Sequence, residues 1–143
     1  MMISDKGTAL IRNFEGCKLV PYLCPAGKPT IGIGHVIQAS ESFSTITLQE
    51  AMDLFFKDLA PIEVAITRAL KMDIMQCEFD ALCSFAFNLG IRALLGSTLF
   101  KLLNKGCIIE AADEFARWNK VAGKPMAGLT LRRQAEKDLF LGD

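Results

Sequence analysis

The sequence predicts an α+β protein that folds as a single domain, because one stretch suited to a small sheet is followed by several stretches suited to helices. Residues 18–46 lack helical periodicity and are rich in Gly, Pro, Ser and Thr. After this stretch, apolar residues recur mostly at intervals of three and four, which is typical of helices. A chain of 143 residues that is 51% hydrophobic and contains ten Phe has ample material for one core. Strands and helices segregated in this way define the α+β class.

The segments at the start of the chain have clear boundary residues. Ser4 is suited to cap a first helix that extends to about Phe14, and Gly16 supplies its C-terminal stop. Residues 19–22 and 30–33 are expected to pair as two strands joined by a turn that contains Gly and Pro. The first 46 residues therefore predict one helix and a hairpin.

Helices are predicted for most of the remaining chain. Thr47 and Glu50 fit a capping box at the start of a long helix, and Pro61 is expected to kink or break it. The segment 76–88 is apolar nearly all round, which predicts a central helix. Three further helices are predicted, at residues 97–104, 107–118 and 129–141.

Charge and cysteine content argue against several classes of protein. The net charge is zero, so we expect no nucleic-acid partner. The segment 117–137 is locally basic and could be a binding face for an anionic polymer or a solvated helix surface. The five Cys follow no zinc spacing and are interpreted as reduced thiols, with Cys77 and Cys83 in the core. No apolar run approaches the ~18 residues that cross a bilayer, and no signal peptide is recognisable.

An acid, a thiol and a hydroxyl group occur close together near the start of the chain. Glu15 ends the first predicted helix, Cys24 follows on a loop, and Thr30 begins a predicted strand. This pattern can place a proton donor on one side of a bond and a water-holding pair on the other side. Hydrolysis of a glycosidic bond needs a proton for the departing oxygen and help for the sugar carbon from the opposite face. An apolar environment would favour the protonated form of the acid that this reaction needs.

These residues closely resemble the catalytic region of the phage-type lysozymes, glycoside hydrolase family 24. The spacing matches the family motif, with eight residues between Glu15 and Cys24 and five between Cys24 and Thr30. Further blocks follow in the family's order and cover nearly the whole chain. They include Phe14-Glu15-Gly16, Thr30-Ile31-Gly32-Ile33-Gly34-His35, Phe79-Asp80-Ala81-Leu82, Ser84-Phe85-Ala86-Phe87-Asn88-Leu89-Gly90, Ser97-Thr98-Leu99, and Gly128-Leu129 followed by Arg132-Arg133 and Glu136.

The resemblance implies a lysozyme-like fold and a function. A small N-terminal lobe with a short β-sheet, about residues 15–46, would join a larger all-helical lobe, about residues 62–143 plus the N-terminal helix. The protein would be an N-acetylmuramidase that cleaves the β-1,4 bond between N-acetylmuramic acid and N-acetylglucosamine in peptidoglycan, for lysis of a bacterial host by a phage. It would need no metal or organic cofactor. We expect a monomer that stays in the host bacterial cytoplasm until it is released to the cell wall.

The resemblance also assigns roles to the three residues of the motif. Glu15 would be the general acid, and Thr30 would hold the attacking water. Cys24 stands where many relatives have Asp, and it could orient the water together with Thr30, act as a weak base, or attack the sugar. The first role is favoured and gives inversion at the anomeric carbon. We expect the neighbouring Glu15 carboxylate to raise the pKa of Cys24 above its ordinary value near 8.5.

Residues for substrate binding follow from the resemblance as well. Phe87 and Asn88 end the central helix near where family members line the sugar cleft. Asn88 could bind the acetamido groups of the glycan or cap the end of the helix. Arg132 and Arg133 would approach the catalytic acid or the anionic peptide stems. Trp118 completes an apolar helical stripe and is expected in the core instead.

His35 is the only histidine, so a hydrolase that pairs Cys24 with His35 is conceivable. The sequence shows no third group and no oxyanion-binding motif to support that reading. The resemblance instead implies a structural ion pair between His35 and Asp58 with no part in the chemistry.

Two alternatives to a hydrolase stay open at this point. The thiol at the position of the usual Asp allows a catalytically weak or inactive module that binds wall glycan. A lytic transglycosylase would need the acid but no water-holding partner.

Overall fold

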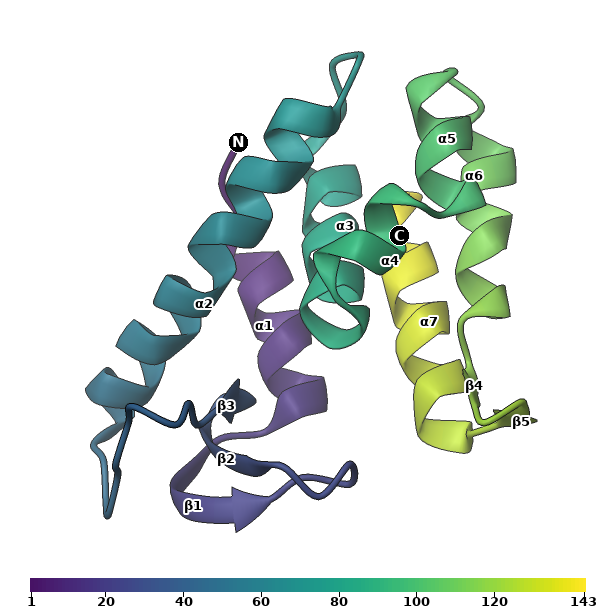
Figure 1. Cartoon of the computed structure of the whole chain (residues 1–143). Helices are drawn as coiled ribbons and strands as arrows, with labels where there is room; N and C mark the ends of the chain where they lie inside the picture. The colour runs from purple at the N-terminus through teal and green to yellow at the C-terminus, as the bar shows by residue number, and fades with distance from the viewer. The chain divides into compact units, whose positions relative to one another are not determined.

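The computed structural model describes residues 1–143 and contains seven α-helices, one 3-10 helix and five short strands (Figure 1). The chain forms two compact units. Unit 1 comprises residues 1–10 and 62–143, and unit 2 comprises residues 11–61. The predicted α+β class is confirmed, because the protein combines helices with two small antiparallel sheets, the larger of which is confined to residues 18–36. No helix combines the length and the apolar character that crossing a bilayer requires.

A three-stranded antiparallel sheet lies in unit 2. Its strands are β1 (Lys18–Leu23), β2 (Pro29–Gly32) and β3 (His35–Val36), and the strand order is β1-β2-β3. Tyr22 lies opposite Thr30 in the β1–β2 ladder, and the register is irregular between Lys18 and Tyr22. The predicted hairpin is confirmed. The third strand was not predicted, because two residues carry no recognisable alternation of apolar and polar side chains.

The sheet of unit 2 packs on a small apolar core formed by Ile31, Ile46 and Ala51. Cys17, a free thiol that precedes β1, packs against the same core. Gly32 has a φ of +65°, and a Cβ atom at this position would lie 3.4 Å from the Cβ atom of Ala51. A glycine is therefore needed here both for the backbone conformation and for the close approach of strand and helix.

The helices α1 (Asp5–Glu15) and α2 (Leu48–Ala69) each include residues of both units. Ser4 caps α1, since its Oγ accepts a hydrogen bond of 3.3 Å from the backbone N–H three residues on. The predicted capping box of α2 is confirmed. The Glu50 backbone N–H donates to Thr47 Oγ1, and the Thr47 backbone N–H donates to Glu50 Oε1, both at 3.1 Å.

The helix α2 continues through Pro61, so of the two predicted outcomes the break is wrong, while the kink stays a prediction. A proline inside a helix removes one backbone hydrogen bond and crowds the preceding turn. Pro61 itself is exposed, so water can bind the carbonyl group that loses its partner. Leu59 and Ile66, on either side of the proline, are fully buried, and their packing holds the helical conformation.

Unit 1 is built mostly from helices. They are α3 (Gln76–Leu89), α4 (Ile91–Leu95), α5 (Thr98–Asn104), α6 (Ile108–Glu114), the 3-10 helix η1 (Phe115–Arg117) and α7 (Ala127–Phe140). A short hairpin of β4 (Lys120–Val121) and β5 (Lys124–Pro125) precedes α7 (Figure 1). Residues 78–86 of α3 are all buried, and α3 packs along α7. The predicted central helix is therefore confirmed.

The structure corrects several details of the helical predictions. The helix predicted over 107–118 is shorter, because the 3-10 helix η1 replaces its last part, and the five-residue α4 was not predicted. Cys83 is buried as expected, whereas Cys77 is only half-buried. Trp118 is half-buried with its ring centroid 5.3 Å from that of Phe85, so it packs on the core of unit 1 as predicted.

Candidate active site

The candidate acid, Glu15, is the last residue of α1 and is half-buried. The helix stops there because Gly16 adopts a left-handed φ of +72°, and its N–H donates to the Arg12 carbonyl at 2.8 Å. The helix end thus fixes where the backbone of the acid lies before the chain enters β1. The prediction of an acid at a glycine-terminated helix end matches the structure.

The turn between β1 and β2 brings Cys24 and Thr30 together. The Cys24 N–H donates to the Lys28 carbonyl at 3.0 Å, and Thr30 Oγ1 donates to the same carbonyl at 2.9 Å. The Thr30 hydroxyl group also contributes to lowering the pKa of the Cys24 thiol. Thr30 is 2% exposed, whereas Cys24 is half-buried on the turn. The thiol is therefore the member of this pair that solvent reaches more readily.

The structure lowers the pKa of Cys24, which corrects the predicted increase. The largest cause is a hydrogen bond to the sulfur from the Lys28 backbone N–H. Burial acts in the opposite direction, but a second backbone N–H from Ala26, the Thr30 hydroxyl group and the Lys28 charge all favour the thiolate. Sequence reasoning considered only the neighbouring carboxylate and missed the N–H groups that the turn supplies.

Tyr22 lies next to two of the candidate residues and was not predicted as part of the site. It is the cross-strand partner of Thr30, so both side chains lie on the same face of the sheet. Burial, and then the charges of Glu15 and Cys24, raise the pKa of its phenol, which places both groups within electrostatic range of one side chain. The Lys18 Nζ lies 4.5 Å from the centroid of the Tyr22 ring. The sequence did offer a signal for Tyr22, because it lies two residues before Cys24, which follows directly after β1, and residues two apart in extended chain lie on one face.

His35 is bound by two carboxylates rather than one. Its Nδ1 lies 2.7 Å from Asp58 Oδ2, as the resemblance implies, and its Nε2 lies 2.9 Å from Glu41 Oε1, which was not predicted. A neutral imidazole has one donor, whereas two carboxylates need two, so the contacts require the imidazolium form. Burial lowers the pKa of His35, but the hydrogen bonds and charges of the two acids outweigh it and raise the pKa overall.

This cluster predicts a pH-dependent contribution to stability. Because the pKa of His35 is raised in the folded state, its contribution is complete below the unfolded value near 6.5 and is lost as pH rises through the folded value. Asp58→Asn should lower the free energy of unfolding at pH 6 by on the order of 1–2 kcal/mol, since a charge-assisted hydrogen bond is lost at a partly exposed site. Urea unfolding at pH 6 and pH 9 measures this, and the difference between wild type and variant should shrink at pH 9.

The same variant tests whether the cluster takes part in the chemistry. Turnover of Asp58→Asn should stay close to the wild-type value at a temperature where both proteins are folded. Asp53→Asn changes an exposed acid of the same helix and serves as the matched control. A large drop in turnover with unchanged unfolding would refute a purely structural role.

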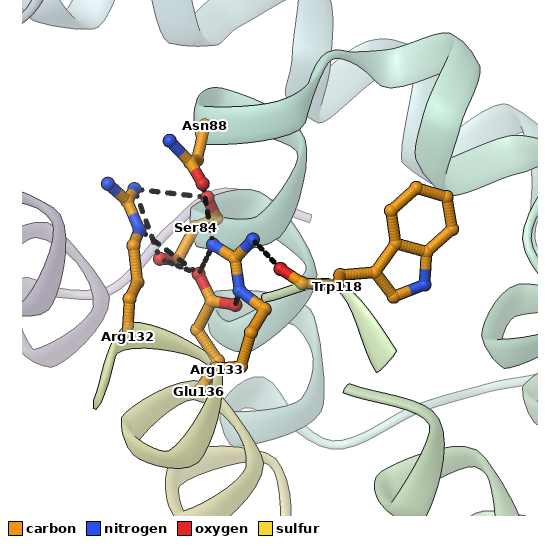
Figure 2. Close-up of polar contacts among 6 residues, drawn as sticks. All are labelled: Ser84, Asn88, Trp118, Arg132, Arg133 and Glu136. Carbon is orange, nitrogen blue, oxygen red and sulfur yellow. Dashed lines mark hydrogen bonds and ion pairs between the residues drawn. The ribbon is translucent and has the colours of Figure 1, made fainter. Parts of the chain in front are cut away.

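The residues predicted to bind substrate all lie in unit 1. Figure 2 shows three of them, Asn88, Arg132 and Arg133. Phe87 and Asn88 are half-buried in the last turn of α3. Arg132 and Arg133 of α7 are 4% and 1% exposed, and both contact Glu136, which is fully buried and was not assigned a role from the sequence. The two arginines are therefore core residues, and their burial argues against direct contact with a glycan or a peptide stem.

The basic segment 117–137 does not form one continuous binding face, because two of its cations are buried and others are paired or exposed to solvent. Arg117 pairs with Glu114 at 2.8 Å, and Lys137 pairs with Asp113 at 3.0 Å. The two arginines of α7 are buried. Lys120 and Lys124 remain exposed on the β4–β5 hairpin. The exposed cations of the segment are thus Lys120, Lys124 and the acid-paired Arg117, which give little basis for binding an anionic polymer.

The α+β fold places an acid at the end of a helix and a thiol on the following hairpin, and the family match makes the protein a hydrolase of the lysozyme type. The chain matches the family model described as phage lysozyme over residues 12–136, and it belongs to that family.

Individual relatives agree with this assignment over nearly the full length of the chain. It is 41% identical over 144 residues to an endolysin of Acyrthosiphon pisum secondary endosymbiont phage 1, with 98% of each chain covered. Among solved structures, an endolysin from Escherichia coli O157:H7 phage FAHEc1 superimposes with a TM-score of 0.90 at 36% identity, covering 99% of this chain and 94% of that one. The muramidase domain of SpmX from Asticaccaulis excentricus gives 0.88 at 35% identity, covering 98% and 97%.

Proposed function

We propose that this chain cleaves the β-1,4 bond between N-acetylmuramic acid and N-acetylglucosamine in bacterial peptidoglycan. Membership of the phage lysozyme family makes it a peptidoglycan hydrolase that serves phage lysis. The observation that supports a catalytic rather than a binding role is the thiol of Cys24. Two backbone N–H groups, the Thr30 hydroxyl group and the Lys28 charge lower its pKa against the effect of burial, which a residue that only fills space in a turn would not need.

In the proposed reaction, Glu15 donates its proton to the glycosidic oxygen as the bond from that oxygen to the sugar carbon breaks. A water molecule attacks the carbon from the opposite face, and Cys24 orients it together with Thr30. The proton that the water loses passes to the Cys24 thiolate, and the product has the inverted configuration. The sulfur takes the place of the second carboxylate, so the separation of two carboxyl groups is no guide to stereochemistry here.

Thr30 has one hydroxyl proton and two possible acceptors for it. In the structure the hydroxyl donates to the Lys28 carbonyl, and a Thr30 hydrogen bond also stabilises the thiolate of Cys24. We propose that the hydroxyl turns toward the sulfur when the thiol ionises and toward the carbonyl when the thiol is protonated. Because Thr30 is 2% exposed, its effect on the water would pass largely through the position and charge of Cys24.

Phe87 and Asn88 are proposed to contact the glycan, and we infer a monomer that stays in the host cytoplasm until it is released to the wall. No observation favours the binding module or the transglycosylase over hydrolysis.

Digestion of purified peptidoglycan tests the proposed reaction. We expect mass analysis of the soluble fragments to show muramic acid at a free reducing end, because water is the acceptor. Anhydro-muramic acid ends would indicate a transglycosylase. Binding of wall material without any release of fragments by the wild-type protein would indicate a binding module. Anomeric NMR of the first products, taken before mutarotation, distinguishes inversion from retention.

A further inference from the structure

The hairpin formed by β1, β2 and the turn between them exposes mostly apolar side chains (Figure 1). From residue 18 to residue 29, every position except Tyr22 and Cys24 is exposed. Each exposed residue of this segment is apolar, a glycine or a lysine, and none carries a hydroxyl group, a side-chain amide or a carboxylate. The large exposed apolar residues are Leu19, Val20 and Leu23. Apolar side chains gathered in one exposed segment mark a surface that contacts a partner.

The charge of this hairpin is entirely positive. Lys18 and Lys28 are both exposed and lie near its two ends. No Asp or Glu occurs between Glu15 and Glu41. Apolar side chains flanked by lysines suit the boundary between lipid headgroups and acyl chains. There the apolar groups enter the hydrocarbon layer, while the ammonium groups stay among anionic headgroups.

The free edge of the sheet offers little to a further strand. The strand β1 is an outer strand of the three-stranded sheet. Pro21 in its middle has no N–H to donate, and the Leu19 carbonyl already accepts a hydrogen bond of 2.9 Å from the Ile46 N–H. A strand added by a second copy of the chain or by another protein would lack both of these backbone partners. The hairpin is therefore suited to a partner that is bound through side chains.

The most exposed of the apolar side chains lies on the face of the hairpin that the candidate site does not use. Leu23, which is 69% exposed, lies opposite Pro29 in the ladder, whereas Tyr22 lies opposite Thr30. Successive side chains of a strand point to opposite faces, so Leu23 and Pro29 occupy the other face from Tyr22 and Thr30. A partner bound on the Leu23 face leaves the Tyr22 face uncovered.

We propose that residues 18–29 form a docking site for an anionic lipid surface. The leucines and the valine of this segment enter the headgroup region, and its two lysines bind the anionic headgroups. A polymer that offers only charge would leave the large apolar side chains in water, whereas a lipid surface removes them from it. The inference goes beyond the proposed reaction and is independent of it, because it concerns the surface that the protein binds.

Flotation with lipid vesicles tests this docking site. Wild type should bind vesicles of phosphatidylglycerol mixed with phosphatidylcholine at least about fivefold more tightly than vesicles of phosphatidylcholine alone. Leu23→Asp should lower the partition coefficient on the mixed vesicles by at least about tenfold, since it removes an inserted side chain and adds a repelled charge. Leu131→Asp is the matched control and should bind as wild type does, because this leucine of α7 is 66% exposed and the change in charge is the same.

The contribution of the lysines has a control in the same local sequence. Residues 26–29 and 122–125 both read Ala-Gly-Lys-Pro. Lys28→Gln should lower the partition coefficient about fivefold, the effect of one lysine close to an anionic surface, whereas Lys124→Gln should leave it unchanged. In about 1 M NaCl, where the Debye length is roughly 3 Å, Lys28→Gln and wild type should bind almost equally.

Thermal unfolding shows whether the variants are folded, and Val20→Asp with Val121→Asp as its control replaces the leucine pair if Leu23→Asp does not fold. No binding of wild type to the mixed vesicles overturns the inference, and so does an equal loss of binding in the two leucine variants. A wild-type dimer in sedimentation velocity that Leu23→Asp dissociates would show that a second copy occupies the hairpin instead. Loss of cosedimentation with purified peptidoglycan in Leu23→Asp, with vesicle binding retained, would assign the hairpin to the wall polymer and likewise overturn lipid docking.

Discussion

Glu15→Gln should lower kcat for peptidoglycan hydrolysis by about 10²–10⁴-fold, the range for loss of a positioned general acid. The amide has nearly the same shape as the acid and can occupy the end of α1, but it has no acidic proton for the departing oxygen. KM should change little, because the proposed role is confined to the transition state. Turbidity loss of a wall suspension and release of reducing ends measure the effect.

A loss of turnover through missing acid catalysis must be distinguished from a loss of turnover through unfolding. Glu110→Gln makes the same chemical change at an exposed position of α6 and should keep wild-type activity. Thermal unfolding of both variants should agree with wild type within a few degrees. Glu15→Gln with more than a tenth of the wild-type turnover would exclude Glu15 as the general acid, whereas equal activity near zero in wild type and variant would favour the binding module.

The second large effect is expected at Cys24 and appears in the pH profile. If the thiolate receives the proton of the attacking water, turnover rises with pH as the thiol ionises. The contacts of the turn lower the pKa of Cys24, so the rise begins at a lower pH than for an ordinary thiol. Cys24→Asp should lack this rise above neutral pH, because a carboxylate with an ordinary pKa near 3.9 is already ionised there.

Removal of the sulfur completes the experiment. Cys24→Ala should reduce kcat by about 10²-fold across the pH range, since no group then receives the proton of the water. Cys107→Ser changes a half-buried thiol of unit 1 and should leave both the rate and the profile unchanged. An alanine variant that keeps the wild-type rate and the alkaline rise would show that Cys24 only occupies space.

The parts of the fold that follow from local rules could be predicted from the sequence. The first helix, the hairpin and the capping box depend on short-range signals, namely a polar cap, a glycine stop and alternation along a strand. The break predicted at Pro61 failed because the local cost of a proline was weighed without the packing of buried neighbours such as Leu59. Elements of two to five residues, such as β3 and α4, carry too little pattern to be seen.

The candidate site likewise has features that could be predicted from the sequence and features that could not. The acid, the thiol and the hydroxyl group follow from spacing and resemblance, and their roles remain proposals. The direction of the Cys24 pKa shift depends on backbone N–H groups, which have no sequence signature. The buried set of Ser84, Arg133 and Glu136 joins residues from two helices, so their contacts arise only from tertiary packing.

Lys28 acts on the hairpin through two different parts of itself. Its main chain holds the turn, since its carbonyl binds Cys24 and Thr30, and any amino acid other than proline would supply the same main-chain groups. Its ammonium group lowers the pKa of the Cys24 thiol and is the smallest of the contributions to that pKa. The conformation of the turn and the pKa of the Cys24 thiol thus depend on different parts of Lys28. A natural or engineered substitution of the Lys28 side chain would therefore shift the pKa of Cys24 slightly, and with it the proposed pH dependence of turnover. The conformation of the loop would stay the same.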